Sequence, residues 1–213
     1  MDRKGKFIVF EGIDCCGKTT QLRKFADFLY SHNKYNHLIL TREPYQSRAI
    51  RTLMQTDTEA TSNKEKCSDE FIADRKTHIK EVISPNMEKG LIILDDRYKY
   101  STLCYQTAQG MLFDDLVKAH EGMPVPDLAF IFDVPVNIAR KRMGLETRVK
   151  EGKFENDINF QKRLRELYLL LPRLLPEEPI LILNGVAHID AIAKDIQTLY
   201  FNKFPEEKTS FYK

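Results

Sequence analysis

Short, nearly continuous apolar runs alternate along this chain with segments whose apolar residues recur every three or four positions. The runs predict strands at Phe7–Phe10, His37–Thr41, Leu91–Leu94, Leu128–Phe132 and Ile180–Leu183. Runs this short and this continuous are typical of strands that are buried on both faces of a parallel sheet. The pattern therefore predicts parallel strands that are connected by helices.

Two of the intervening segments have a clear helical period. One aligns Phe160, Leu164, Leu167, Tyr168 and Leu171 on a single face, and the other aligns Ile189, Ile192, Ile196, Leu199 and Tyr200. Asp157 precedes the first segment and suits the N-cap position. The alternation predicts an α/β fold with a doubly wound, five-stranded parallel sheet. Ligands in such folds bind at the carboxyl ends of the strands, so residues that directly follow a strand are the first candidates for a site.

Three polar segments read as irregular structure. Thr56–Lys66 is predicted to be a loop, and Met143–Asn156, which contains Gly144 and Gly152, has the composition of a short lid. The tail Lys203–Lys213 is expected to fray. We find no internal repeat, and a chain of 213 residues is expected to form one domain, from residue 1 to 213, with a substantial core.

Composition excludes several classes of protein. With 33 basic and 31 acidic side chains the net charge is +2, which argues against a dedicated nucleic-acid binder. The start of the chain lacks a secretory apolar region, and no run approaches the ~18 apolar residues of a membrane span. The cysteines lack zinc-ligand spacing and are too few for a disulfide scaffold, which favours a reduced, cytoplasmic setting. A redox role for the adjacent Cys15 and Cys16 is the less favoured alternative.

The first predicted strand leads directly into a phosphate-binding motif. The residues Gly12, Ile13, Asp14, Cys15, Cys16, Gly17, Lys18 and Thr19 match the pattern G-x-x-x-x-G-K-[ST], and a helical segment begins at Thr20. Amides of such a loop and of the helix N-terminus converge on an anion. Lys18 would bring its charge to the β- and γ-phosphates, and the Thr19 hydroxyl would help to hold Mg²⁺. The motif predicts a nucleoside triphosphate site.

A second candidate group follows the third predicted strand, where the chain reads Asp95-Asp96-Arg97-Tyr98. A carboxylate at a strand end that faces a phosphate-binding loop typically orders Mg²⁺ and its waters. A neighbouring arginine can bind a second phosphate through its fork of donors. An ordinary surface ion pair is the alternative.

The chain resembles the thymidylate kinases, most closely the archaeal and bacterial members. The resemblance is carried by Phe10–Asp14, Gly17–Gln21, Thr41–Pro44, Phe71–Arg75, Asp96–Tyr98, Ser101, Thr102, Tyr105, Gln106, Pro126–Leu128, Asp133–Pro135 and Lys153–Glu155. These motifs occur in the family's order over roughly residues 7–160. The resemblance implies the P-loop nucleoside monophosphate kinase fold, with ATP as donor, Mg²⁺ as cofactor and dTMP as acceptor.

The resemblance also assigns acceptor contacts. Phe71 matches the ring that stacks on thymine, and Arg75 matches the arginine that donates to thymine O4. Their i, i+4 spacing places them on one helix face. Thr102 matches a residue at the pyrimidine edge, and Tyr105 matches the ring that leaves no room for a 2′-hydroxyl. Pro44, Ser101 and Gln106 stand at further dTMP-binding positions of these motifs.

The phosphate contacts are assigned in the same way. Arg97 matches the arginine that binds the 5′-phosphate of the acceptor, and Asp96 matches the acid associated with Mg²⁺. Asp14 matches the carboxylate that contacts the sugar 3′-hydroxyl. Arg51 matches a second phosphate ligand, although the preceding loop is shorter than in many members, and Arg48 is its competitor.

One position departs from part of the family. Some members carry an arginine directly after the P-loop aspartate, where this chain has Cys15. Phosphoryl transfer places charge on the equatorial oxygens, so a cation is required there. The chain resembles the class whose lid supplies it, with Arg148 as first choice and Arg142 as second. Alternatively, these arginines only solvate a loop.

The resemblance thus predicts phosphorylation of dTMP to dTDP by ATP, in a cytoplasmic enzyme that forms a homodimer. A deoxynucleoside kinase that acts on an unphosphorylated deoxynucleoside is the alternative enzyme. A nucleotide-dependent switch without turnover is the alternative from another class, and it is disfavoured because Lys18, Asp96 and the lid arginines are all present.

Overall fold

The computed structural model describes residues 5–56, 59, 61–144, 154 and 157–209. Within these residues, five strands form one parallel sheet in the order β2-β3-β1-β4-β5. The strands are β1 (Lys6–Glu11), β2 (Leu38–Arg42), β3 (Ile92–Asp96), β4 (Leu128–Asp133) and β5 (Ile180–Asn184). Each predicted strand is present within one or two residues, and the predicted α/β fold is confirmed.

Helices connect these strands and cover both faces of the sheet. They are α1 (Lys18–His32), α2 (Arg48–Thr56), α3 (Lys64–His78), α4 (Ser84–Glu88), α5 (Lys99–Ala108), α6 (Phe113–Ala119), α7 (Val136–Met143), α8 (Ile158–Leu174) and α9 (Ile189–Lys203). A π-helical turn (Ile79–Ile83) joins α3 to α4, and a 3₁₀ turn (Pro205–Lys208) follows α9. No helix in the described ranges is both long enough and apolar enough to span a bilayer.

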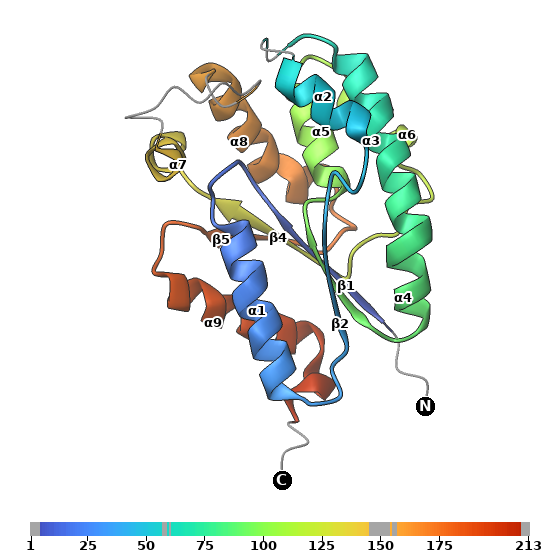
Figure 1. Ribbon diagram of the computed structural model, residues 1–213. Helices are drawn as coiled ribbons and strands as arrows, with labels where there is room; N and C mark the ends of the chain where they lie inside the picture. Colours follow the sequence, from blue (N-terminus) through green and yellow to red (C-terminus); the bar gives the residue numbers. More distant parts are fainter. Residues whose placement is uncertain (1–4, 57–58, 60, 145–153, 155–156, 210–213) are drawn as a thin grey trace.

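The strand order determines which helices share a face. The connection from β1 to β2 runs one way along the sheet, and the later connections run the other way. Because parallel crossovers are right-handed, α1 lies on one face and the helices between β2 and β5 lie on the other. In Figure 1, α1 packs beside α9, while α3, α5 and α8 form a contiguous layer.

The core is centred on β1, where all six residues are buried. Phe10 of β1 contacts the rings of Phe25, Phe130 and Phe132, which come from α1 and β4. The edge strands are more open, and Leu40 of β2 is 52% exposed. The predicted N-cap is confirmed, because the Asp157 side chain accepts a hydrogen bond from the Phe160 amide at 2.9 Å.

Two predicted loop boundaries are wrong. Lys64–Lys66, expected in a loop, form the first turn of α3. The tail does not fray at Lys203, because the 3₁₀ turn that follows is anchored to β1: Glu207 is buried and accepts from Lys6 Nζ at 2.6 Å. Most of the predicted lid lies outside the described residues, as do residues 210–213.

Candidate active site

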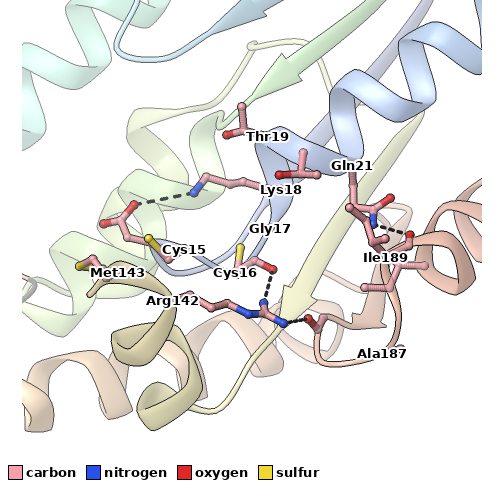
Figure 2. Close-up of a pocket in the computed structure, with 14 residues that line it drawn as sticks. Cys15, Cys16, Gly17, Lys18, Thr19, Gln21, Arg142, Met143, Ala187 and Ile189 are labelled. Carbon is pink, nitrogen blue, oxygen red and sulfur yellow. Dashed lines mark hydrogen bonds and ion pairs between the residues drawn. The ribbon is translucent and has the colours of Figure 1, made fainter. Parts of the chain in front are cut away.

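The P-loop, between β1 and α1, forms one wall of a pocket of about 800 Å³. The opposite wall comes from the end of α7 and the segment between β5 and α9, which contribute Arg142, Met143, Gly185, Ala187 and Ile189. Figure 2 shows Arg142, Met143, Ala187 and Ile189 around the loop. The pocket therefore lies at the carboxyl ends of β1 and β5, at the edge of the sheet where the fold predicts ligands.

The backbone of this loop requires its first glycine. Gly12 has a φ of 137°, and a Cβ there would lie 2.9 Å from the Phe132 carbonyl oxygen. Cys15 adopts a left-handed φ of 59°, which is uncommon for a residue with a side chain. Lys18 is only 7% exposed, and its Nζ lies 3.7 Å from Asp14 Oδ1. The loop thus holds the lysine close to an acid.

Thr19 and Asp96, the two residues predicted for Mg²⁺, are in contact. The Thr19 hydroxyl donates a hydrogen bond to Asp96 Oδ2, from the first turn of α1 to the end of β3. Both side chains offer oxygen ligands, which are the ligands that Mg²⁺ prefers. The pair consequently fits a magnesium site beside the P-loop.

Arg97 connects β3 to the P-loop. Its guanidinium donates to the Asp14 carboxylate, to the Gly12 carbonyl oxygen at 3.2 Å and to Ser101 Oγ at 3.0 Å. Tyr105 also donates to Asp14, at 3.2 Å. Burial alone would raise the pKa of Asp14, but the charges of Arg97 and Lys18 lower it to about 2. Asp14 is therefore an anion between two cations.

Sequence reasoning missed two residues that support Arg97. Glu11 is buried at the end of β1 and accepts from the Tyr98 amide at 2.7 Å and from Ser101 Oγ at 2.7 Å. Tyr168 of α8 donates to Glu11 at 3.0 Å and lies 3.4 Å from Arg97 Nη1. A charge at the end of an apolar strand could have flagged Glu11. Tyr168 gave no signal, because it stands on an ordinary apolar helix face.

A second pocket, of about 360 Å³, lies next to the first and shares Asp14 with it. The expected acceptor residues that line it are Asp14, Pro44, Phe71, Arg75, Arg97, Ser101, Thr102, Tyr105 and Gln106. Ile50, Met54 and Phe154 add apolar surface. The structure therefore brings together almost the whole predicted acceptor set, from four separate parts of the chain.

Arg75 is the most deeply buried charge in this pocket, at 1% exposure. Glu43, which follows β2, accepts from Arg75 Nε at 2.7 Å and lies 2.6 Å from Nη2. Nη2 also donates to the Tyr98 carbonyl oxygen at 3.2 Å and to Thr102 Oγ1 at 3.0 Å. Since Thr102 accepts here, its own hydroxyl proton is available to a ligand.

The remaining predicted arginines are placed differently. Arg51 and Arg48 are exposed on α2 and line neither pocket, although Ile50 and Met54 of the same helix line the second one. Arg142 ends α7 and donates to the carbonyl oxygens of Cys16 (3.3 Å) and Gly185 (3.0 Å), as Figure 2 shows for the P-loop contact. Arg148 lies outside the described residues.

A buried acidic cluster lies behind the acceptor pocket. Asp95 is fully buried, and neither carboxyl oxygen has a hydrogen-bond partner in the described part of the chain. Its Oδ2 lies 3.9 Å from His78 Nδ1, which is 3.2 Å from Glu43 Oε1. Burial and the negative charge of Glu43 raise the pKa of Asp95 well above its usual value. The geometry favours a neutral carboxyl group at this position.

The Cys16 thiol does not support the redox alternative, whereas the adjacent Cys15 is exposed. Cys16 is buried, and burial raises the pKa of its thiol. No disulfide joins the cysteines, all of which lie in the described ranges. A buried thiol with a raised pKa is a poor nucleophile, so Cys16 is a packing residue of the loop.

Comparison with known proteins identifies the family of the chain. A sequence model described as thymidylate kinase matches residues 10–196. A probable thymidylate kinase of Pyrococcus horikoshii is 35% identical over 202 residues, which cover 92% of this chain and 96% of that protein. One of Thermococcus kodakarensis is 32% identical over 210 residues (94% and 100%), and a bacterial thymidylate kinase, of Desulfotalea psychrophila, is 32% identical over 195 (90% and 92%). With a match along nearly its whole length and a P-loop beside a second pocket, the chain belongs to the thymidylate kinase family.

Proposed function

We propose that this chain transfers the γ-phosphoryl group of ATP to dTMP and releases ADP and dTDP. The observation that carries the proposal is that the two pockets meet at Asp14, with Arg97 bonded to that carboxylate. A donor in the P-loop pocket and an acceptor in the second pocket would present their phosphates to each other across this pair. Proximity of this kind is the main requirement of phosphoryl transfer.

The P-loop pocket is proposed to hold ATP. Amides of residues 12–20 would bind its phosphates, and Lys18 would bridge the β- and γ-phosphates. The wall formed by Arg142, Ala187 and Ile189 is proposed to receive the base. The Arg142 guanidinium is anchored to two carbonyl oxygens and can present its flat face to an aromatic ring.

Thr19 and Asp96 are proposed to hold Mg²⁺, Thr19 as a ligand and Asp96 directly or through water. The bound ion would neutralise charge on the β- and γ-phosphates. Asp96 accepts a hydrogen bond from the Thr19 hydroxyl, which keeps the oxygens of the two side chains together beside the P-loop.

The second pocket is proposed to hold dTMP. Phe71 would stack on thymine, and Arg75 and Thr102 would bond its edge. The Tyr105 hydroxyl donates to Asp14, and the Tyr105 ring would exclude a 2′-hydroxyl. Arg97 would exchange Asp14 for the acceptor phosphate. Arg51 or Arg48 would reach that phosphate only by turning inward from α2.

Transfer is proposed to be direct and in line, without a covalent enzyme intermediate. The acceptor phosphate oxygen forms the new P–O bond as the bond to ADP breaks, and the chain contributes position and positive charge. Lys18, Arg97 and an arginine of the lid would meet the charge that develops on the transferred group. A protein nucleophile is not needed for this reaction.

An ADP-release assay with dTMP, dUMP, dCMP, TMP (the ribonucleotide) and thymidine tests the proposal. Turnover with dTMP and none with thymidine is expected, because Arg97 would bind the acceptor's phosphate. Preference for thymidine would favour a deoxynucleoside kinase instead. By analogy with the family we also propose one domain, a cytoplasmic location and a homodimer, the last of which light scattering after size exclusion would test.

A further inference from the structure

Arg75, the proposed thymine-reading residue, is held from two opposite sides. Glu43 engages its Nε–H, as described above. On the other side, Nη1 lies 2.7 Å from Nε2 of His120, which follows α6. His120 is 4% exposed and lies 45 positions away in the sequence, so no local pattern would connect the two residues.

The hydrogen-bond directions around His120 are unambiguous. Its Nδ1 lies 2.6 Å from the Leu116 carbonyl oxygen, which can only accept, so Nδ1 carries the proton. Arg75 can only donate, so Nε2 must be the unprotonated acceptor. The ring is therefore neutral and held in one tautomer. Burial and the charge of Arg75 lower the pKa of His120 to about 4, which is consistent with this assignment.

The bonds of Arg75 leave little freedom to its guanidinium. Arginine has five N–H donors. Glu43 accepts the Nε–H and also contacts Nη2, whose two hydrogens are shared with Tyr98 and Thr102, and His120 accepts one of the two Nη1 hydrogens. One Nη1 hydrogen has no acceptor among the described residues, and Arg75 lines the acceptor pocket.

We propose that His120 is a positioning residue for base selection: by accepting from Nη1, it directs the remaining Nη1–H of Arg75 at a carbonyl oxygen on the pyrimidine of the acceptor. This rests on the proposed function of the second pocket. A fixed donor selects bases with a carbonyl group at this edge, such as thymine and uracil. It rejects cytosine, whose amino group would oppose one donor with another and leave both unpaired.

Two substitutions separate the two bonds of His120. His120→Gln can place an amide oxygen near the position of Nε2, and so keeps an acceptor for Arg75 while it loses the bond to Leu116. His120→Asn can place an amide N–H near the position of Nδ1, and so keeps the bond to Leu116 while it loses the acceptor. A role in packing alone predicts similar effects of both changes.

The experiment measures Kd for dTMP, dCMP and ATP by calorimetry, with kcat and KM alongside. We expect His120→Asn to raise the Kd for dTMP roughly tenfold and to reduce the ratio of the dCMP and dTMP dissociation constants by a similar factor. The Kd for ATP should stay within about twofold of the wild-type value. His120→Gln should keep most of the preference. Equal effects of both variants on dTMP, or an unchanged preference in His120→Asn, would overturn the proposal.

Further measurements cover the other outcomes. If His120→Asn does not fold, His120→Phe takes its place in the comparison with His120→Gln, since Phe keeps a ring and offers no acceptor. The two variants must then differ in their preference between dTMP and dCMP. In an Arg75→Lys background, His120→Asn should change the preference by less than twofold, and a full effect there counts against the proposal. The proposed function is tested separately, by the activity of the wild type on dTMP. The comparison of variants does not depend on that result, because it uses the pyrimidine nucleotide that the wild type binds most tightly.

Discussion

Arg97, at the end of β3, donates a hydrogen bond to the carboxylate of Asp14 in the loop after β1. This contact joins the two pockets, and it occupies the donors that an acceptor phosphate would use. Arg97 has a left-handed φ of 83°, and the Glu11–Ser101–Tyr168 network supports this conformation. Uncommon backbone of this kind gathers at functional sites. The arginine is therefore preorganised for an anion.

The first prediction concerns this arginine. Arg97→Gln should weaken the binding of dTMP by about 10–100-fold, because a hydrogen bond to a charged group contributes about 1.5–3 kcal/mol. Thymidine, used as a competitive inhibitor, should keep its Ki within about threefold, since it lacks the phosphate. Inhibition constants for thymidine and KM for dTMP provide the measurement. An equal loss of affinity for dTMP and for thymidine would show that Arg97 shapes the pocket and does not bind phosphate.

The second prediction concerns Lys18. Lys18→Met keeps the aliphatic stem of a side chain that is largely buried, so we expect a melting temperature close to that of the wild type. Removal of the charge should lower kcat by roughly 10²-fold or more, as for other groups that stabilise a developing anion. Steady-state kinetics measure the expected loss of kcat, and thermal melting measures the expected unchanged stability. Near-normal turnover in a folded variant would exclude the phosphate role.

The third prediction concerns Tyr105, whose hydroxyl donates to Asp14 at 3.2 Å. Tyr105→Ala removes the ring and should narrow the preference for dTMP over its ribonucleotide by roughly tenfold, because the space for a 2′-hydroxyl opens. Tyr105→Phe is the matched control, since it keeps the ring and removes only the hydroxyl, and it should retain the preference. Competition assays with both nucleotides measure the ratio. A ratio unchanged in Tyr105→Ala would assign sugar selection to another residue.

The fourth prediction concerns Asp95. Its folded pKa is raised, mainly by burial, so its favourable contribution to folding is complete below about pH 3.9, the pKa of the unfolded chain, and is lost as pH rises through the folded pKa. Asp95→Asn cannot ionise, so its stability relative to the wild type should increase between pH 5 and pH 8. Chemical unfolding at several pH values measures the difference. The opposite trend would mean that a cation pairs with this carboxylate in solution.

The fifth prediction distinguishes the roles of the two candidate lid arginines, Arg142 and Arg148. Arg142 is bonded to the P-loop and to Gly185, so Arg142→Ala should mainly raise KM for ATP. Arg148, which the family resemblance assigns to the charge on the transferred group, should mainly lower kcat when it is replaced by alanine. Kinetics on the single and double variants separate the two. If no variant lowers kcat tenfold, the lid does not supply the missing cation.

Local patterns predicted the site well where neighbouring residues share one element. The spacing of Gly12, Gly17 and Lys18 predicts a phosphate cradle because these residues belong to one short loop, and in the structure residues of this loop line a pocket. Phe71 and Arg75 share a helix face through their i, i+4 spacing, and both line the second pocket. The alternation of strands and helices likewise predicted the parallel sheet, because period and length reflect only short-range geometry.

The ends of the secondary-structure elements and the contacts that support the site could not be predicted in the same way, because they depend on segments that are distant in sequence. Pro205–Lys208 form a 3₁₀ turn after α9 in which Glu207 accepts from Lys6, whereas the polar composition of this segment alone predicted fraying. Arg51 matched a motif position, yet the orientation of α2 leaves it exposed and turns Ile50 inward.

The sequence by itself determined the family, and it predicted a phosphate loop and a set of acceptor residues, because each is encoded by residue types at close, ordered spacing. Only the tertiary structure decided how these residues are held: Tyr168 beside Arg97, and His120 opposite Glu43 on Arg75. The physical reason is that hydrogen bonds are satisfied in space. The acceptor of a buried arginine can come from any element that packs against it, and one-dimensional spacing carries no record of that packing.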